Sequence, residues 1–263
     1  NTYSMIKRLR TGYLPSAVVT TYDNRYLVVA NLGSEYFNVY DLDTLEPRPG
    51  IVHNAGGDVR AIGVSRHALL ASAVDHQNKG HILRYDESCN CMVQYETLGS
   101  MKNELQPDAY MVSAPDGSSI VFMQTDGIVI LYDDELDTFA AARKYTDKLT
   151  GVVAGGIGQY VIGNRILDAS LVSRTTLDSG TGNTTGFVFL DNGAIRFTAT
   201  NASSPGVAQR VNLTTGVQYN PIRLVEAPLL TTTQFPFLRT VAALPNRSAF
   251  VALTTSGFTV VPW

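Results

Sequence analysis

The sequence predicts an all-β protein built from small sheets that repeat along the chain, and three observations support this class. Apolar and polar residues alternate in short runs, tight polar turns separate the runs, and helix-forming stretches are scarce. Equivalent first-strand positions recur about every 45 residues, at Val18, Ile62, Met111, Val153, Val188 and Val241. A small sheet cannot bury its apolar face alone, so neighbouring units must stack. The pattern therefore predicts a β-propeller of four-stranded antiparallel blades.

Each repeat unit divides into strands separated by Gly, Pro, Asn and Asp turns such as Asp23-Asn24 and Pro115-Asp116-Gly117. The first three units predict strands at 16–20, 26–30, 37–40 and 47–52, at 59–64, 68–74, 81–85 and 92–95, and at 109–114, 119–124 and 128–132. The last three predict strands at 151–154, 160–162 and 166–171, at 186–190, 194–199 and 208–213, and at 240–244, 249–253 and 258–261. Residues 137–144 are expected to form a single helical turn or part of an outer strand, and long loops are expected at 173–185 and 231–237.

The number of blades depends on the N-terminal segment. Thr2 to Leu9 alternates like an outer strand, yet no inner strands precede it. It either completes the blade that begins at Thr240, which makes six blades, or belongs to a seventh blade whose beginning is missing. We expect residues 1–263 to be a single propeller domain and a segment of a longer polypeptide.

Composition favours an exported β protein. The 263 residues are 44% hydrophobic and only 16% charged, with a net charge of −3, and Thr, Ser, Asn and Gly are plentiful. The only basic cluster is the short run Lys7-Arg8-Leu9-Arg10, so no nucleic-acid partner is expected. No apolar run approaches the roughly 20 residues of a transmembrane helix. We expect an extracytoplasmic location, secreted or at the cell surface.

The two cysteines, Cys89 and Cys91, lie one residue apart and share one face if they are on a strand. They are either two thiols or an incidental bridge on an outer strand. Two thiolates alone make an incomplete zinc site, and a redox role would need a partner that the sequence does not show.

A resemblance to a known repeat class supports the same fold. The residues Tyr26-Leu27-Val28-Val29-Ala30-Asn31, Ser34, Val39-Tyr40-Asp41 and Thr44 resemble a YVTN-type propeller repeat. The chain is also similar to the propeller region of large secreted or cell-surface proteins of acidobacteria, at 9–16, 225–230 and 253–263. This resemblance implies an extracytoplasmic bacterial protein truncated at both ends, and it brings no catalytic residues. The Trp-Asp pairs of WD-repeat propellers are absent.

Catalytic chemistry has little support in the residues. The four histidines, His53, His67, His76 and His81, fall in one unit or at its border, whereas a metal on a propeller axis needs ligands from several blades. His76 and His81 flank a hairpin turn and are expected to be solvated. The acidic run at 133–137 suits either a calcium site or, more simply, a hairpin turn. We assign no catalytic, cofactor-binding or metal-binding residue, expect no cofactor, and favour a protein that is not an enzyme.

The leading hypothesis is a propeller that binds a protein or glycan partner or joins an extracellular assembly. Its candidate interaction surface comprises four tyrosines expected to be exposed, Tyr13, Tyr36, Tyr110 and Tyr219. Two alternatives stay open. One is a lactonase-like propeller hydrolase with an axial metal, and the other is a structural subunit of a surface layer or filament.

Overall fold

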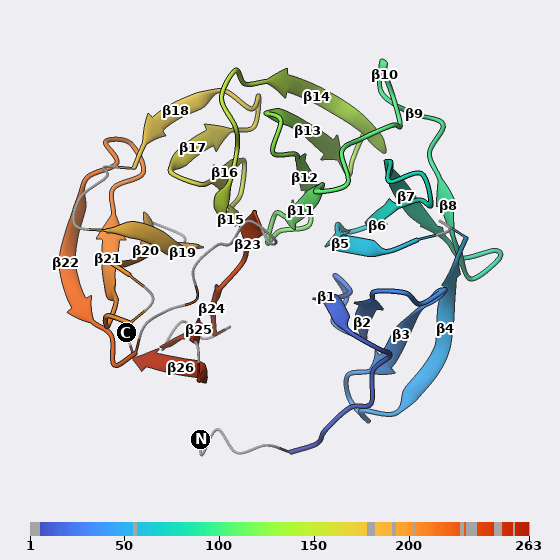
Figure 1. Cartoon of the computed structure of the whole chain (residues 1–263), viewed down its shortest axis with the longest axis horizontal. Helices are drawn as coiled ribbons and strands as arrows, with labels where there is room; N and C mark the ends of the chain where they lie inside the picture. The colour runs from blue at the N-terminus through green and yellow to red at the C-terminus, as the bar shows by residue number, and fades with distance from the viewer. Residues whose placement is uncertain are drawn as a thin grey trace. The chain divides into compact units, whose positions relative to one another are not determined.

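The computed structural model describes residues 6–54, 57–177, 182–190, 193–201, 203–226, 229, 236–244, 249–254 and 256–262. Within these ranges the chain contains strands and turns and no helix, which confirms the predicted all-β class (Figure 1). The chain forms two compact units. The first unit holds residues 1–124 and 132–140, and the second holds residues 125–131 and 141–263.

The first unit begins with two four-stranded antiparallel blades. The first blade comprises β1 (Pro15–Thr20), β2 (Tyr26–Asn31), β3 (Tyr36–Asp41) and β4 (Pro47–His53). The second blade comprises β5 (Val59–Val64), β6 (Leu69–Val74), β7 (Gly80–Asp86) and β8 (Cys91–Gln94). Their fourth strands pair in parallel, so that the two blades join into one eight-stranded sheet in the order β1-β2-β3-β4-β8-β7-β6-β5.

Turn chemistry explains why the strands of these blades end where they do. Asn24, Asn78 and Asn90 adopt the left-handed backbone conformation that asparagine tolerates, with φ of 56°, 60° and 50°. The Asp41 carboxylate accepts hydrogen bonds from the backbone N–H groups of residues 43 and 44 at 3.2 and 3.1 Å. These side chains satisfy backbone groups that leave the sheet and fix the register of the hairpins.

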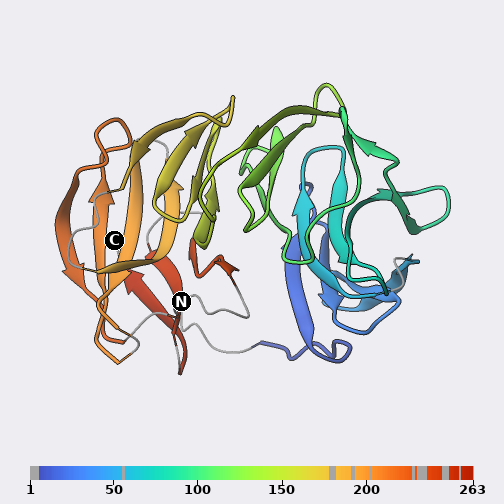
Figure 2. The same cartoon turned by 45° about the horizontal axis from the view of Figure 1, so that its top comes forward.

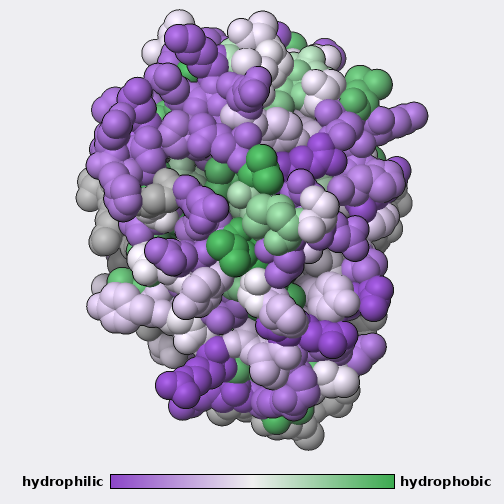
Figure 3. Space-filling model, turned by 90° about the vertical axis from the view of Figure 1, so that its right-hand side faces the viewer, coloured by the Kyte–Doolittle hydropathy of each residue, from purple (hydrophilic) through white to green (hydrophobic). Residues whose placement is uncertain are grey.

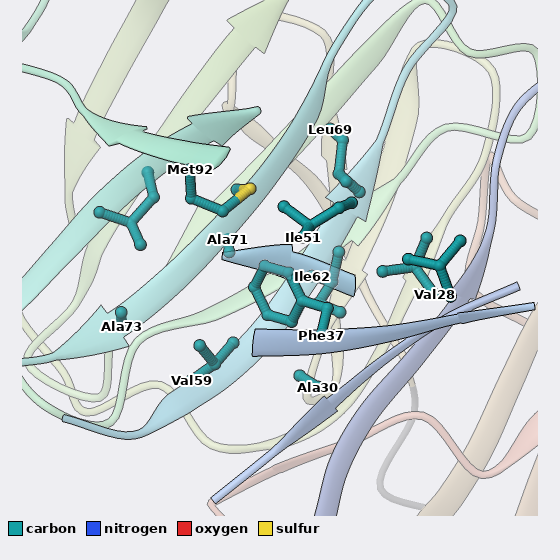
Figure 4. Packing of buried hydrophobic residues seen from close by; sticks show 12 residues of the cluster. Val28, Ala30, Phe37, Ile51, Val59, Ile62, Leu69, Ala71, Ala73 and Met92 are labelled. Carbon is teal, nitrogen blue, oxygen red and sulfur yellow. The ribbon is translucent and has the colours of Figure 1, made fainter. Parts of the chain in front are cut away.

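The eight-stranded sheet doubles back on itself, because its two edge strands β1 and β5 contact each other. A hydrophobic cluster fills the space between the two blades (Figure 4). Phe37 and Val28 of the first blade lie there with Val59 and Ile62 of the second, and all four are buried. Burying each aliphatic side chain contributes about 1.5–3 kcal/mol. The first two blades therefore stabilise each other, as the repeat pattern predicts.

A short hairpin follows the second blade and was not predicted. Its strands, β9 (Thr97–Leu98) and β10 (Met101–Lys102), have two residues each. The next sheet has the order β11 (Tyr110–Ser113), β12 (Ser119–Met123), β13 (Ile128–Asp133) and β14 (Thr138–Lys144). The segment 137–144 thus supplies an outer strand, one of its two expected structures. Its burial alternates along the first five residues of β14, as one face of a strand requires.

The second unit continues the pattern of antiparallel sheets. One contains β15 (Gly151–Gly155), β16 (Gln159–Ile162), β17 (Arg165–Asp168) and β18 (Ser173–Thr176), and β23 (Phe237–Leu238) pairs in parallel with β15. The next contains β19 (Asn183–Leu190), β20 (Gly193–Ala199), β21 (Val207–Val211) and β22 (Gln218–Arg223), drawn in yellow to orange in Figure 2. The last contains β24 (Val241–Ala243), β25 (Ala249–Thr254) and β26 (Gly257–Pro262).

Two expectations about irregular segments need correction, and a third falls mostly outside the described residues. Ile6 to Leu9 is not in a strand, and the rest of the expected N-terminal strand, 2–5, lies outside the described residues. The expected loop 173–185 instead contains β18 and the start of β19, and its residues 178–181 lie outside the described part. Most of the other expected loop, 231–235, also lies outside it. Short polar strands such as β18 carry too little apolar alternation to be recognised from sequence.

Candidate functional site

A cavity of about 910 Å³ opens between the first and second blades of the first unit. Four segments line it, at 21–26, 48–51, 64–69 and 85–90. The first is the β1–β2 turn, the third is the β5–β6 turn and the fourth is the β7–β8 turn, so that both blades present chain reversals to the opening. We call this space the interblade cavity. Its volume falls within the range of natural ligand pockets, about 300–1,000 Å³.

The floor of the interblade cavity is apolar. Val28, Val39, Ile51 and Leu69 are buried members of the cluster that joins the two blades, and half-buried Val64 packs against them. The cavity is therefore an unfilled end of the core between the blades. An apolar side chain that entered it would bury surface against aliphatic groups at about 25 cal/mol per Å².

Arginine and tyrosine side chains form one edge of the cavity. The guanidinium carbons of Arg25 and Arg48 lie 5.3 and 6.0 Å from the centre of the Tyr26 ring, within the range of cation–π contacts. Arg48 also lies 3.6 Å from an Asp41 carboxylate oxygen, and its side chain is 50% exposed. An ion pair with that exposure contributes about 0–1 kcal/mol. Both guanidinium groups therefore remain accessible to a ligand.

The β5–β6 turn supplies a second basic edge, with exposed Arg66 at its centre. The Arg66 Nε donates to the Asp116 carbonyl at 2.9 Å, and its backbone N–H donates to the Gly117 carbonyl at 3.0 Å. A hydrogen bond with Tyr22 raises the pKa of Arg66. Gly117 has φ of +70°, and a Cβ there would lie 2.6 Å from the Tyr22 ring. Glycine at this position thus allows the β11–β12 turn to lie close to Tyr22.

A buried carboxylate holds the next residue of the same turn. His67 donates its backbone N–H to Asp134 Oδ1 at 2.9 Å, and its Nδ1 lies 2.8 Å from Oδ2. The Asp134 side chain is only 2% exposed, whereas that of His67 is 73% exposed. Burial opposes ionisation of Asp134, but the hydrogen bonds from Ser65 and His67 together lower its pKa. Asp134 therefore fixes the β5–β6 turn while His67 faces the cavity opening.

The third edge of the cavity is tied by a disulfide between Cys89 and Cys91, which settles the choice that the sequence left open. Asn90, between them, donates its side-chain N–H to the Gly50 carbonyl at 2.9 Å and accepts from the Tyr85 hydroxyl at 3.1 Å. Its carbonyl accepts from the backbone N–H of residue 52 at 3.3 Å. The bridged turn of the second blade is thereby joined to β4 of the first.

None of the four tyrosines expected to form the interaction surface lines the interblade cavity. Tyr13, before β1, is 79% exposed, Tyr36 on β3 is 54% exposed and Tyr219 on β22 is 44% exposed, whereas Tyr110 on β11 is half-buried. The cavity uses Tyr22 and Tyr26 instead. These two residues flank the β1–β2 turn. The sequence feature that could have identified them is an aromatic residue on each side of a turn. Nothing in the linear sequence connects them with Arg48.

An apolar area lies on the outer face of the first unit. Figure 3 shows hydrophobic side chains in the middle of the face that carries β4 and β8, with polar side chains around them. Val52 and Val93 are 42% and 48% exposed, and Tyr36 pairs with Val52 across β3 and β4. Val52 is also the parallel partner of Cys91, so the disulfide lies beside this exposed valine.

The histidines lie in different environments. His81 was expected to be solvated, but it is buried, with Nδ1 2.7 Å from the Asn103 carbonyl and Nε2 3.0 Å from an Asp75 carboxylate oxygen. His53 is buried beside Phe37, and burial lowers its pKa. The structure brings no three His, Cys, Asp or Glu side chains of its described residues together as a metal-binding group.

The acidic run at 133–137 forms a hairpin turn, as favoured from sequence. Asp133 accepts from the backbone N–H of Leu136 at 3.0 Å, and Asp137 binds Arg84 and accepts from the Tyr132 hydroxyl at 2.6 Å. Arg84 is the main cause of the lowered pKa of Asp137.

In the described part of the chain no helix is long and apolar enough to span a bilayer.

Comparison with known proteins supports the fold. No family description matches the chain, and no curated protein matches it. Among solved structures, it is similar to a WD40 propeller chain in a crystal structure of a mitotic checkpoint complex, with a TM-score of 0.64 and 14% identity. The match covers 94% of this chain and 73% of that one. At this identity the likeness concerns the fold alone, and it confirms the predicted β-propeller class.

Proposed function

We propose that this protein is a protein-interaction module that binds a segment of its partner in the interblade cavity. The observation that carries the proposal is the combination of an aliphatic floor with a rim of tyrosine and arginine side chains. Tyrosine and arginine are enriched among the residues that dominate protein interfaces, because each combines an apolar body with directional polar groups.

The rim of the cavity is held in place before any ligand arrives. Asp134 fixes the β5–β6 turn from below, and the Cys89–Cys91 bridge closes the β7–β8 turn. The turn at 21–26 is braced by Asp23, which accepts from the Thr21 hydroxyl at 2.6 Å. A site whose loops are already ordered loses less conformational entropy on binding, so more of the contact energy appears as affinity.

A random dodecapeptide display library selected on the immobilised protein tests the proposal. Selected peptides are expected to bind the wild type and to lose binding to Tyr26→Ala and to Leu69→Trp, which remove the rim ring and fill the floor. Tyr219→Ala is the matched control, since this exposed tyrosine lies outside the cavity. Circular dichroism establishes that each variant folds. Peptides that bind all variants equally, or the absence of any cavity-dependent peptide, would refute the proposal.

We also propose an extracytoplasmic location and a YVTN-like repeat ancestry in a bacterial surface protein. The low content of charged residues supports the location, and so does the disulfide, because disulfides persist in oxidising compartments. The location can be tested on protein isolated from its natural source, by alkylating it under denaturing conditions and measuring its mass. Cys89 and Cys91 should resist alkylation until a reductant is added, and two free thiols in native material would contradict the proposed location. Glycan binding and self-assembly stay hypotheses.

A further inference from the structure

We propose that the interblade cavity recognises an acidic, extended peptide segment, with an apolar side chain on the floor and a carboxylate against the edge formed by Arg25 and Arg48. This inference rests on the proposed function and names the chemistry of the partner at that site. It concerns the class of segment that the cavity selects.

The first argument is the placement of two cations beside one ring. Arg25 and Arg48 approach the same Tyr26 ring, so their like charges are held in one small region of the rim. The electron-rich face of the ring offsets this repulsion by about 0.5–1 kcal/mol at an exposed site. A carboxylate offsets it further, because a guanidinium group presents a planar fork of donors that matches carboxylate geometry.

The second argument is that the nearby acidic groups are occupied or lie elsewhere. Asp23 accepts from the Thr21 hydroxyl and from the backbone N–H of Arg25 at 3.1 Å, so it braces the turn. Asp41 accepts three hydrogen bonds within its own turn, and its distance of 3.6 Å from Arg48 is long for a strong pair. Glu87 lies on the β7–β8 turn of the other blade. Asp23 and Asp41 thus balance the charges of Arg25 and Arg48 without accepting a close hydrogen bond from either guanidinium group, so the guanidinium N–H donors can bind a carboxylate of the ligand.

The third argument comes from the depth profile of the cavity. The guanidinium groups lie on exposed residues, whereas Ile51 and Leu69 below them are buried. A ligand must present charge at the rim and apolar surface at depth. An extended chain does this with successive side chains, because they point to opposite sides. A segment that places Asp or Glu next to Leu or Phe satisfies both requirements.

The composition of the display-selected peptides tests the inference. Cavity-dependent peptides should be enriched in Asp and Glu beside apolar residues. Synthetic copies in which the acidic residues become Asn or Gln should bind about tenfold more weakly, as expected for a lost charge-assisted hydrogen bond. The protein variants Arg25→Gln and Arg48→Gln should weaken the parent peptides similarly and leave the neutral copies unaffected. Raising the salt concentration should weaken only the acidic peptides.

Two further variants serve as controls. Arg8→Gln removes an exposed arginine that does not line the cavity and should leave affinity unchanged. Glu87→Gln removes a like charge from the lining and should tighten binding of acidic peptides about twofold. If peptides depend on the cavity but carry no acidic bias, or ignore Arg25→Gln and Arg48→Gln, the inference falls and the proposed function stands. If no peptide depends on the cavity, both fall.

Discussion

The junction between the first two blades and the junction between the last two sheets of the second unit are built on the same strand pattern but are filled differently. In the second unit the rings of Phe197 and Phe250 are fully buried and meet edge to face, 6.3 Å apart. In the first unit the buried cluster between the blades contains one phenylalanine, Phe37, among aliphatic side chains, and the ring of Tyr26 lies at the rim. A pair of phenylalanine rings fills the junction in the second unit, whereas the junction in the first unit has one buried phenylalanine and an open end.

The difference shows how side-chain content determines whether a junction in a repeat fold contains a cavity. A propeller blade needs only an alternating apolar face to stack on its neighbour, and aliphatic and aromatic residues both satisfy that requirement. Side-chain volume then decides whether the junction is solid or hollow at its end. In the first unit, the polar groups that surround the hollow come from turns, which tolerate substitution far better than strands do. Substitutions at both junctions can test this comparison.

The largest effect is expected at the filled junction. Phe250→Ala in the second unit removes a fully buried ring and should reduce the free energy of unfolding by about 3–5 kcal/mol. Val64→Ala on the floor of the interblade cavity should cost about 1 kcal/mol or less, because the side chain is half-buried beside open space. Urea unfolding followed by circular dichroism measures both. Equal losses would mean that the first junction is as tightly packed as the second.

The support beneath the cavity rim should give the next largest effect. Asp134→Asn keeps the shape of the side chain but removes the charge that holds His67, and it should cost about 2 kcal/mol, as for hydrogen bonds to a charged group. Selected peptides should also bind more weakly, because the β5–β6 turn loosens. Asp133→Asn is the matched control, since that carboxylate caps an exposed turn. A loss at Asp133 equal to that at Asp134 would argue against the special role of the buried carboxylate.

The bridge that ties the third edge should have a smaller effect. Replacing Cys89 and Cys91 together by Ser opens a ring of three residues, for which chain entropy predicts a loss of about 1.5 kcal/mol. Peptide affinity should fall as well, because Asn90 positions Tyr85 and Gly50. Asn90→Ala keeps the bridge and removes these contacts. If it leaves affinity intact while the double serine variant lowers it, the bridge acts by a route other than Asn90.

Strand positions could be predicted from sequence because they depend on local alternation, whereas the cavity depends on contacts between distant residues. The strand expected at 59–64 coincides with β5, and most other strands differ by one or two residues. His81 was misjudged because its burial comes from the segment around Asn103, 22 residues further along the chain. Arg48 and Tyr26 meet only when β4 pairs with β3, which in turn pairs with β2. No short-range pattern records such a meeting.

The smallest effect is a pH dependence confined to the first unit. Burial lowers the pKa of His53 below its ordinary value of 6.5, so the unfolded chain binds this proton more tightly than the folded one. Stability from this group is complete above pH 6.5 and falls as the pH drops towards the lowered value. His53→Leu, which keeps an apolar contact with Phe37, should therefore lose less stability between pH 7.5 and 5.5 than the wild type does. His76→Gln controls for an exposed histidine. The carboxylates whose pKa is lowered titrate below this pH window and do not contribute to the difference. If the stability of His53→Leu changes with pH in parallel with that of the wild type, this histidine does not couple protonation to the packing of the two blades.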